Sequence, residues 1–586
     1  MTSPYQAEGA NAQAQFTLKV HRGESMVLIA MNWRTGKPPA NFVGWFISYK
    51  SPGSTTFKPL SNRIGFSYDP NQPAGPWTST EVSPIQKFRW VHFPVDAEKA
   101  GSFRYRVVPV FMDDNNKLTY GEKQEASIDL GLETYVNELN VAFTRGFVSS
   151  QGFIDRYLKD GHTLDEIMPN SADDGLTFEA KHPQAEDALK WMGFEARDAI
   201  LKLLDAAIAD PAAKVDAIVY DFNLPDIAAK LEQLAPRLRL IVDDSKSVEK
   251  GVDKGHDRPN SPESTVAARL KAAGAQVKRQ HMGSLQHNKT IVVRGGGGPT
   301  ALCGSTNFSW RGFFIQANNA VILKGKKAAD VFAEAFQSYW DAAAAKDFRA
   351  SPSATQPWKD LGLPNSKAAV TFCPHNATNA VLDDLAAYIS KNTTSSVLFA
   401  LAFLYESTGS LRDAITGLEN KPGVFVYGMS DQEVSGIDMK MADGHMAVVY
   451  PDYLTDTDTP ADFKAELSSL PGNGKRGTRL HHKFIVTDFN TPAARVYMGS
   501  FNFSGTADTS NGENLLVFED PRVATAYMVE ALRLFDHYEW RIKRHGATDK
   551  NTPLLLRKPP RKPGEKAWWQ EDWTDKRKAA DRLLFS

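Results

Sequence analysis

The sequence predicts an α/β protein in which an all-β domain is followed along the chain by two repeated α/β lobes. Three observations support this prediction. Residues 1–132 consist of short apolar runs separated by Pro, Gly and Asn clusters, a pattern typical of antiparallel strands. Residues 133–366 alternate apolar strands with helical patterns, and residues 367–545 repeat that alternation. Such alternation favours a sheet that is covered by helices on both faces.

The N-terminal residues 1–132 are expected to form a β-sandwich. Residues 101–111 (GSFRYRVVPVF) alternate polar and apolar side chains, and DDNNK follows as a turn. This texture resembles an immunoglobulin- or fibronectin-type sandwich. At the other end, residues 546–586 form a basic, Pro-rich tail with three tryptophans. We expect these tryptophans to pack on the body of the protein rather than to contact a membrane or nucleic acid.

Composition narrows the function classes. Of the 586 residues, 42% are hydrophobic and 23% charged, with a formal net charge of −1. The strongly basic balance of a nucleic-acid-binding protein is therefore absent, although a local basic cleft remains open. Two cysteines are too few for a disulfide framework or a thiolate metal site. Residues 1–16 are polar, and the longest apolar run (397–405) is too short to span a bilayer. We therefore expect no cofactor, no transmembrane segment and a cytoplasmic location, with signal-free export left open.

A repeated motif carries the chemistry. Residues His287-x-Lys289 recur as His481-x-Lys483, and a GSxNFS segment follows each pair at almost the same distance. A single HxK is nearly worthless as a signal, but two with matched companions are not expected by chance. Packing alone gives no reason to repeat polar residues. The remaining motif positions are Ser305 and Asn307 in the first copy, and Ser500 and Asn502 in the second; eleven residues after these asparagines stand Asn318 and Glu513.

These residue types suit attack on a phosphate. Residues two apart on a strand project from one face, so each histidine should lie beside its lysine. Lysine offers a point charge to a phosphate, and asparagine adds a neutral donor. Histidine can attack phosphorus when neutral or donate a proton when charged. Two such sets that face each other would supply a nucleophile, a general acid and a cationic cradle, without any metal.

The motifs resemble those of the phospholipase D superfamily: HxK, four residues, Asp, a GSxN segment and a later Glu. The second copy matches fully, including Asp488 as a supporting residue. The first departs twice, with Arg294 in place of the Asp and Asn318 in place of the Glu. The resemblance covers about residues 133–544. It implies two lobes related by pseudo-twofold symmetry, an active site at their seam that one chain completes, and a covalent phosphohistidine.

The resemblance also implies roles. The late acidic residue of one half supports the histidine of the other, so Glu513 would bind His287. We therefore favour His287 as nucleophile and His481 as general acid, with both lysines and both motif asparagines as catalytic partners. Ser305, Ser500 and Asn318 are predicted to contact substrate. The Arg294 substitution does not predict inactivity.

The substrate stays open at this stage. The GSFNFS and NGEN segments resemble small bacterial endonucleases of the superfamily, which slightly favours nucleic acid over phospholipid. The alternatives are a true phospholipase D, acting by hydrolysis or phosphatidyl transfer, and a weakly active binding protein with one degenerate lobe. In that last case the N-terminal β domain would dock a partner protein.

Overall fold

The computed structural model of the chain divides into two compact units, residues 1–132 with 525–586, and residues 133–524. Each unit is described here by itself. The structure describes residues 4–67, 77–146, 151–249, 251–295, 297–404, 409–430, 448–449, 480–549 and 555–586.

The first sheet of the larger unit lies in residues 139–324. Apart from the polar edge strand at residues 276–279, its strands are mostly apolar, and most of their side chains are buried, as expected for strands covered on both faces. β13 runs parallel to β14 and antiparallel to β18. In spatial order the strands are β12 (Leu139–Phe143), β20 (Asn319–Lys324), β19 (Thr300–Gly304), β18 (Thr290–Arg294), β13 (Lys214–Val219), β14 (Leu238–Val242) and β17 (Gln276–Arg279).

The second sheet repeats this topology. From β22 to β25 it has the same spatial order and the same parallel and antiparallel neighbours, with β23 parallel to β24 and antiparallel to β26. The chain is thus a mixed α/β protein with two repeated lobes, as predicted. The strands are β21 (Lys359–Asp360), β22 (Lys367–Cys373), β28 (Glu513–Glu519), β27 (Arg495–Gly499), β26 (Lys483–Thr487), β23 (Ser396–Leu401), β24 (Phe425–Ser430) and β25 (Val448–Val449).

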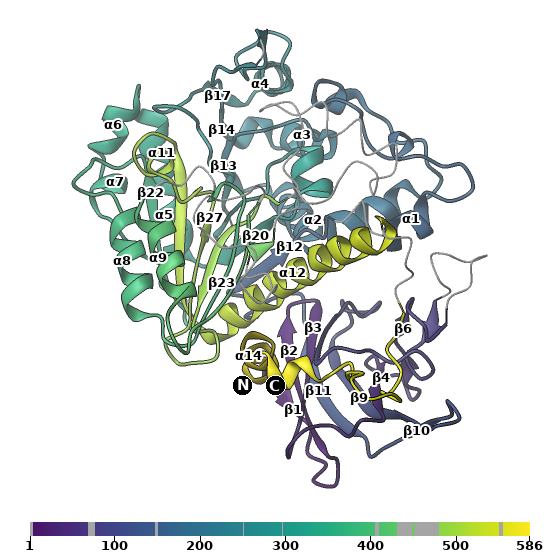
Figure 1. Cartoon of the computed structure of the whole chain (residues 1–586). Coiled ribbons are helices and arrows are strands. Elements are labelled where there is room, and N and C mark those ends of the chain that lie inside the picture. Colours follow the sequence, from purple (N-terminus) through teal and green to yellow (C-terminus); the bar gives the residue numbers. More distant parts are fainter. Residues whose placement is uncertain are drawn as a thin grey trace. The chain divides into compact units, whose positions relative to one another are not determined.

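Helices cover both sheets. The longest helix of the first lobe is α2, and α4 begins with the Ser261 hydroxyl accepting from Ser264 N at 3.1 Å and Pro262 as the first helical residue. α8 and α9 lie side by side (Figure 1). The helices are α1 (Gln151–Tyr157), α2 (Ala185–Ala209), α3 (Pro225–Gln233), α4 (Pro262–Ala272), α5 (Lys326–Asp341), α6 (Ala345–Arg349), α7 (Pro352–Thr355), α8 (Leu382–Asn392), α9 (Ser410–Glu419), α11 (Gly505–Thr509) and α12 (Pro521–Asp549).

The two lobes of this unit contact each other directly. α5 packs on β18, β19 and β20 of its own lobe. It also reaches the second lobe, where the rings of Phe332 and Phe372 lie 5.2 Å apart, edge to face. The hydroxyl of Tyr339 donates to the backbone carbonyl of Cys373 in β22. Because these contacts are buried, they fix the two lobes as one packed body.

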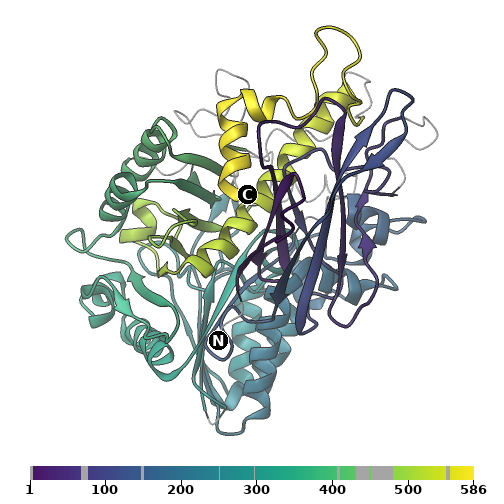
Figure 2. The same cartoon turned by 90° about the horizontal axis from the view of Figure 1, so that it is seen from below.

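The smaller unit contains two larger antiparallel sheets, whose long strands run side by side in purple and blue (Figure 2), and a two-stranded sheet of β6 (Ser61–Asn62) and β7 (Thr78–Ser79). Both sheets contribute to one core around Phe16, Trp45 and Tyr105. The first sheet holds β1 (Gln6–Glu8), β2 (Phe16–Gly23), β3 (Met26–Trp33) and β8 (Arg89–His92); the second holds β10 (Leu118–Tyr120), β9 (Gly101–Met112), β4 (Phe42–Lys50), β5 (Lys58–Pro59) and, on β9, β11 (Gln124–Leu130).

The C-terminal tail belongs to this smaller unit. Trp569 is buried in its core, Trp568 donates to Phe42 O at 3.0 Å, and Trp573 donates to Gly36 O at 2.9 Å. The tail adds the short helices α13 (Glu571–Thr574) and α14 (Lys576–Phe585). Residues 525–545, which the sequence assigned to the second lobe, also group with this unit. Within the described residues, every helix is too short or too polar to cross a bilayer.

Candidate active site

The two His–Lys pairs occupy corresponding places in the two sheets. Lys483, two residues after His481, is the first residue of β26. His287 and Lys289 lie in the extended segment just before β18. The first pair therefore precedes its strand instead of lying inside it, because ladder pairing starts only at Thr290.

Backbone bridges hold the motif segments of opposite lobes together. Gln286 forms a parallel bridge with Gly512, and Ala317 forms one with Leu480. Each of these four residues immediately precedes a predicted site residue in the sequence. The bridges therefore set the histidine of one lobe against the later polar residue of the other.

The two histidines lie close together, and each is hydrogen-bonded to a residue of the other lobe. Their ring centroids lie 6.3 Å apart. Nδ1 of His287 lies 2.9 Å from both carboxylate oxygens of Glu513. Nδ1 of His481 lies 2.8 Å from Asn318 Oδ1 and 3.1 Å from Ser305 O. Since all these neighbours are acceptors, Nδ1 carries the proton in each neutral ring, and Nε2 keeps its lone pair.

The two lysines lie beneath aromatic rings. Each Nζ donates to the carbonyl of the histidine two residues earlier. Lys289 Nζ lies 4.8 Å from the ring centre of Tyr220, and Lys483 Nζ lies 5.4 Å from that of Phe403. All four histidine and lysine side chains of the two motifs are buried. The arrangement places two cations beside the two imidazoles.

The motif serines have matching backbone partners. The hydroxyl of Ser305 accepts from Asn319 N, and that of Ser500 accepts from Asn514 N, both at 3.0 Å. These bonds tie each GSxN turn to the neighbouring strand. The two serines thus fix the backbone of the GSxN turns. Their contact with substrate stays a prediction.

The motif asparagines and glycines are equally symmetric. The buried amide oxygens of Asn307 and Asn502 have no hydrogen-bond partner among the described residues, so these side chains remain available to a ligand. A Cβ at Gly304 or Gly499 would lie 2.4 and 2.2 Å from a backbone oxygen of the next strand. Only glycine permits this close approach.

Burial and charge set the protonation of the site. Burial lowers the pKa of His287 to about 4, although Glu513 pulls it upward. Burial, with the charges of Lys483 and Lys289, lowers the pKa of His481 well below its usual value. At neutral pH both imidazoles of the free protein are therefore neutral, and a neutral imidazole is the nucleophilic form.

Lys289 gives a prediction about pH. Burial lowers the pKa of Lys289 to about 7, although Glu513, Asp221 and Asp243 raise it. An ammonium is charged only below its pKa, so its attraction for a phosphate fades as pH rises through that value. We expect kcat/KM for an anionic phosphodiester to fall above pH 7. In K289R, whose guanidinium stays charged, the pH above which kcat/KM falls should rise by about one pH unit or more. Initial rates across the pH range test this, and an unchanged pH of that fall contradicts it.

Asp488 and Arg294 stand at equivalent positions but make different contacts. The buried carboxylate of Asp488 accepts from the backbone N–H groups of Thr394, Ser395 and Ser396, at 2.7 to 3.1 Å. Arg294 instead forms an ion pair with Asp216 in the first lobe. Asp488 therefore anchors the start of β23.

We expect D488N to destabilise the larger unit by about 1–3 kcal/mol, because the carboxylate accepts several buried bonds that a neutral amide accepts less strongly. R294A should cost less than about 1 kcal/mol, because that side chain is 39% exposed. Urea unfolding of both variants measures the difference. Equal losses of unfolding free energy in D488N and R294A would contradict this prediction, because they would show that the two side chains contribute equally to stability.

Sequence patterns missed three residues beside the first histidine. The rings of Tyr220 and His287 lie 4.8 Å apart, as do those of Tyr220 and His256. Asp243 Oδ2 lies 2.8 Å from His256 Nδ1. Tyr220 and Asp243 follow directly after β13 and β14. In α/β sheets, ligand-binding sites lie at the carboxyl ends of parallel strands. Polar residues directly after two such strands are therefore a sequence signal that could have identified Tyr220 and Asp243.

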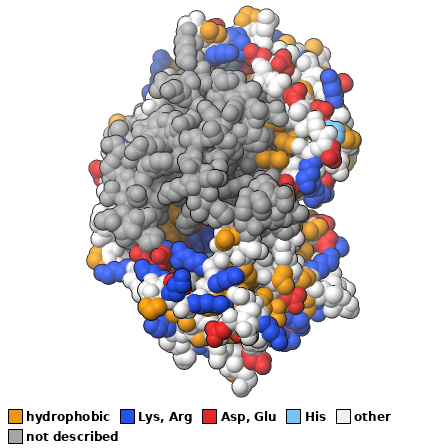
Figure 3. All heavy atoms as spheres, turned by 45° about the vertical axis from the view of Figure 1, so that its right-hand side comes forward, with side chains coloured by type: hydrophobic (Ala, Val, Ile, Leu, Met, Phe, Trp, Pro, Cys, Tyr) orange, Lys and Arg blue, Asp and Glu red, His pale blue; other side chains and the backbone are white. Residues whose placement is uncertain are grey.

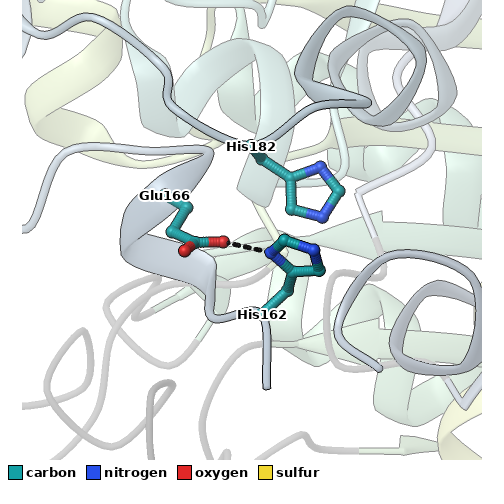
Figure 4. A group of neighbouring side chains, drawn as sticks. All are labelled: His162, Glu166 and His182. Carbon is teal, nitrogen blue, oxygen red and sulfur yellow. Dashed lines mark hydrogen bonds and ion pairs between the residues drawn. The ribbon is translucent and has the colours of Figure 1, made fainter. Parts of the chain in front are cut away.

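Three groups of described side chains place possible metal ligands within 4.8 Å of one another. In the group of Figure 4, the rings of His162 and His182 lie close together, and Glu166 points at His162, with 2.7 Å to its Nδ1. However, His182 Nε2 lies 2.8 Å from Tyr157 O, and its Nδ1 accepts from Gln184 N. With both nitrogens of His182 engaged, hydrogen bonding accounts for this group.

The other two groups are similar. His375 is engaged at both nitrogens, by Asp508 at 2.7 Å and by Thr371 at 2.8 Å. His256, which groups with Asp221 and Glu263, is held through Nδ1 by Asp243. These contacts explain the groups as buried polar networks.

The family comparison agrees with this geometry. The family model described as cardiolipin synthase, phospholipase D-like domain, matches residues 204–340 and 391–535. No curated protein matches the sequence significantly.

Similar solved structures include three proteins of low sequence identity. Polyphosphate kinase from Porphyromonas gingivalis is 11% identical over 91% of this chain and 78% of its own, with a TM-score of 0.38. Phosphatidylserine synthase from Haemophilus influenzae is 13% identical over 67% and 93%, with a TM-score of 0.36. Nuc, a phospholipase D family member from Salmonella typhimurium, is 23% identical over 24% and 86%, with a TM-score of 0.19.

The two segments that the family model matches each contain one His–Lys pair and one GSxN turn. These two segments are therefore phospholipase D-like domains, of the kind found in the phospholipase D superfamily of enzymes that act on phosphodiester bonds.

Proposed function

We propose that the chain is a metal-independent phosphodiesterase that works through a phosphohistidine, with His287 as nucleophile and His481 as general acid. The observation that supports this most strongly is the pair of imidazoles 6.3 Å apart, of which, among the described residues, His287 alone contacts a carboxylate. A carboxylate on Nδ1 orients the ring and stabilises the positive charge that develops on it during attack.

In the first step the Nε2 lone pair of His287 forms a bond to phosphorus, and the bond from phosphorus to the leaving oxygen breaks. His481 donates a proton to that oxygen. His481 is neutral in the free protein, but an anionic phosphate between the lysines offsets their repulsion and favours its protonation. Lys289 and Lys483, with Asn307 and Asn502, stabilise the charge on the phosphoryl oxygens.

In the second step His481 removes a proton from water, whose oxygen attacks phosphorus as the phosphorus–nitrogen bond breaks. This releases the phosphate monoester and restores His287. An alcohol in place of water would give transfer instead of hydrolysis. Because each histidine returns to its starting state, the cycle needs no further reactant.

For the substrate we propose nucleic acid before phospholipid. The C-terminal tryptophans, which would suit a membrane interface, pack in the smaller unit. On the described part of the face in Figure 3, lysine and arginine side chains lie among acidic and apolar ones. The second candidate, a phospholipase D, is favoured by the description of the matched family, which names cardiolipin synthase.

Two parts of the proposal concern the rest of the chain. We propose that the two-sheet unit at residues 1–132 is an immunoglobulin- or fibronectin-like sandwich that binds a protein partner. A cytoplasmic location and a monomeric active site are also part of the proposal.

Hydrolysis of bis-p-nitrophenyl phosphate in the presence of EDTA tests the reaction, and plasmid DNA against phosphatidylcholine vesicles tests the substrate. We expect turnover of the small diester that EDTA leaves intact, and nicking of DNA. Loss of turnover with EDTA contradicts metal independence. A folded protein that turns over none of the three would favour a binding role with a degenerate lobe.

A further inference from the structure

Three side chains, Tyr220, Asp243 and His256, lie beside the first His–Lys pair; Asp243 is fully buried, and the other two are partly buried. The ring of Tyr220 packs against both His287 and His256, with centroid distances of 4.8 Å in both cases. The same ring lies 4.8 Å from Lys289 Nζ. Any shift of His256 is therefore transmitted through one rigid ring to both catalytic side chains of this lobe.

A second route runs through Asp243. One of its carboxylate oxygens lies 2.8 Å from His256 Nδ1, and the other accepts from Gln286 N at 2.6 Å. Gln286 immediately precedes His287 and forms the bridge to Gly512, which immediately precedes Glu513. The His256–Asp243 contact thus fixes the backbone on which the proposed nucleophile and its carboxylate partner are aligned.

The charges reinforce this contact. Burial alone lowers the pKa of His256, but the hydrogen bond that His256 donates to Asp243 and the charges of Glu263, Asp243 and Asp221 raise it to about 9. The bond to His256 also lowers the pKa of Asp243, against the effect of burial. At neutral pH the contact is a buried ion pair, and such charge-assisted bonds are shorter and stronger than neutral ones.

The second lobe places a different ring at this position. Phe403 lies 6.2 Å from His481 and 5.4 Å from Lys483 Nζ. Among the described residues, Phe403 thus takes in the second lobe the place beside histidine and lysine that Tyr220 takes in the first. A nucleophile needs a fixed line of approach to phosphorus, and misplacement by about 1 Å can cost about 100-fold in rate.

We infer that His256 is a positioning residue of the reaction, which aligns His287 and Lys289 through Tyr220 and Asp243. This inference rests on the proposed function. It predicts an effect on the chemical step rather than on substrate binding, because His256 acts through other residues.

Two substitutions separate the routes. H256N keeps a donor for Asp243 but removes the ring from Tyr220, whereas H256F keeps the ring but removes the donor. We expect each variant to form the phosphohistidine about tenfold more slowly in a single turnover, with KM for bis-p-nitrophenyl phosphate changed less than about twofold. H182N is the matched control, because His182 is a buried histidine of the same unit that lies outside the site. It should lower the melting temperature without changing the single-turnover rate of the folded enzyme.

The outcomes are distinct. If H256N and H256F react like the wild type, or lose rate only in proportion to their folded fraction, the inference is wrong and the proposed function stands. If one variant does not fold, the other decides. If the wild type itself forms no phosphohistidine while turning over the diester, the proposed mechanism fails before this inference is reached.

Discussion

Replacing His287 with asparagine should abolish the covalent intermediate and lower kcat by about 10⁴-fold or more, the loss typical of removing a nucleophile from a coupled site. Asparagine cannot attack phosphorus. The measurement is the acid-labile, radiolabelled adduct that is trapped from a labelled phosphodiester and mapped by mass spectrometry, together with steady-state rates.

H481N is the matched variant, because it removes the other imidazole from the same site. A p-nitrophenolate leaves without a proton, so with that leaving group H481N should still form the adduct on His287. Water then lacks its base, and the adduct should accumulate. A diester with a poor alkoxide leaving group should not react. If the label is lost in H481N and retained in H287N, the two roles are reversed.

The sequence predicted the repeat because it follows from local patterns, whereas the meeting of the two motifs at one site was an implication of the family resemblance. Two HxK pairs, each followed by GSxN, required two similar lobes. The strand pattern around them predicted buried sheets, and the structure has them in the same order in both lobes. The family resemblance added the crossing of partners, and Glu513 does lie against His287.

The contacts of Tyr220, Asp243 and His256 beside His287 could not be predicted from sequence patterns. His256 reaches Asp243 after a loop of twelve residues that contains the hairpin of β15 (Val248–Glu249) and β16 (Val252–Asp253). The sequence of such a loop has no periodicity that shows which of its residues will contact Asp243, because the course of a loop depends on tertiary contacts. For the same reason the sequence did not show that residues 525–545 group with the N-terminal unit, since one helix, α12, runs through the boundary.

The strongest test of the division of roles is Glu513→Gln. We expect kcat to fall by about 10³-fold, because a neutral amide neither holds the required tautomer nor stabilises the imidazolium that forms on attack. Glu513 raises the pKa of His287 against the effect of burial. Its removal should therefore move the acid limb of kcat/KM below pH 4, the opposite direction from a general loss of structure.

Asn318→Asp is the control at the equivalent position. It places a carboxylate against Nδ1 of His481, which now lies 2.8 Å from the amide oxygen. The new charge should raise the pKa of His481 and favour its acid form, so kcat should change by less than about tenfold. Nδ2 of Asn318 also donates to Gly312 O at 2.9 Å, and that bond is lost. If N318D costs as much as E513Q, or if E513Q is nearly neutral, the carboxylate does not mark the nucleophile, and His481 becomes the better candidate. If the predicted asymmetry holds, one carboxylate decides which of two nearly symmetric histidines attacks phosphorus.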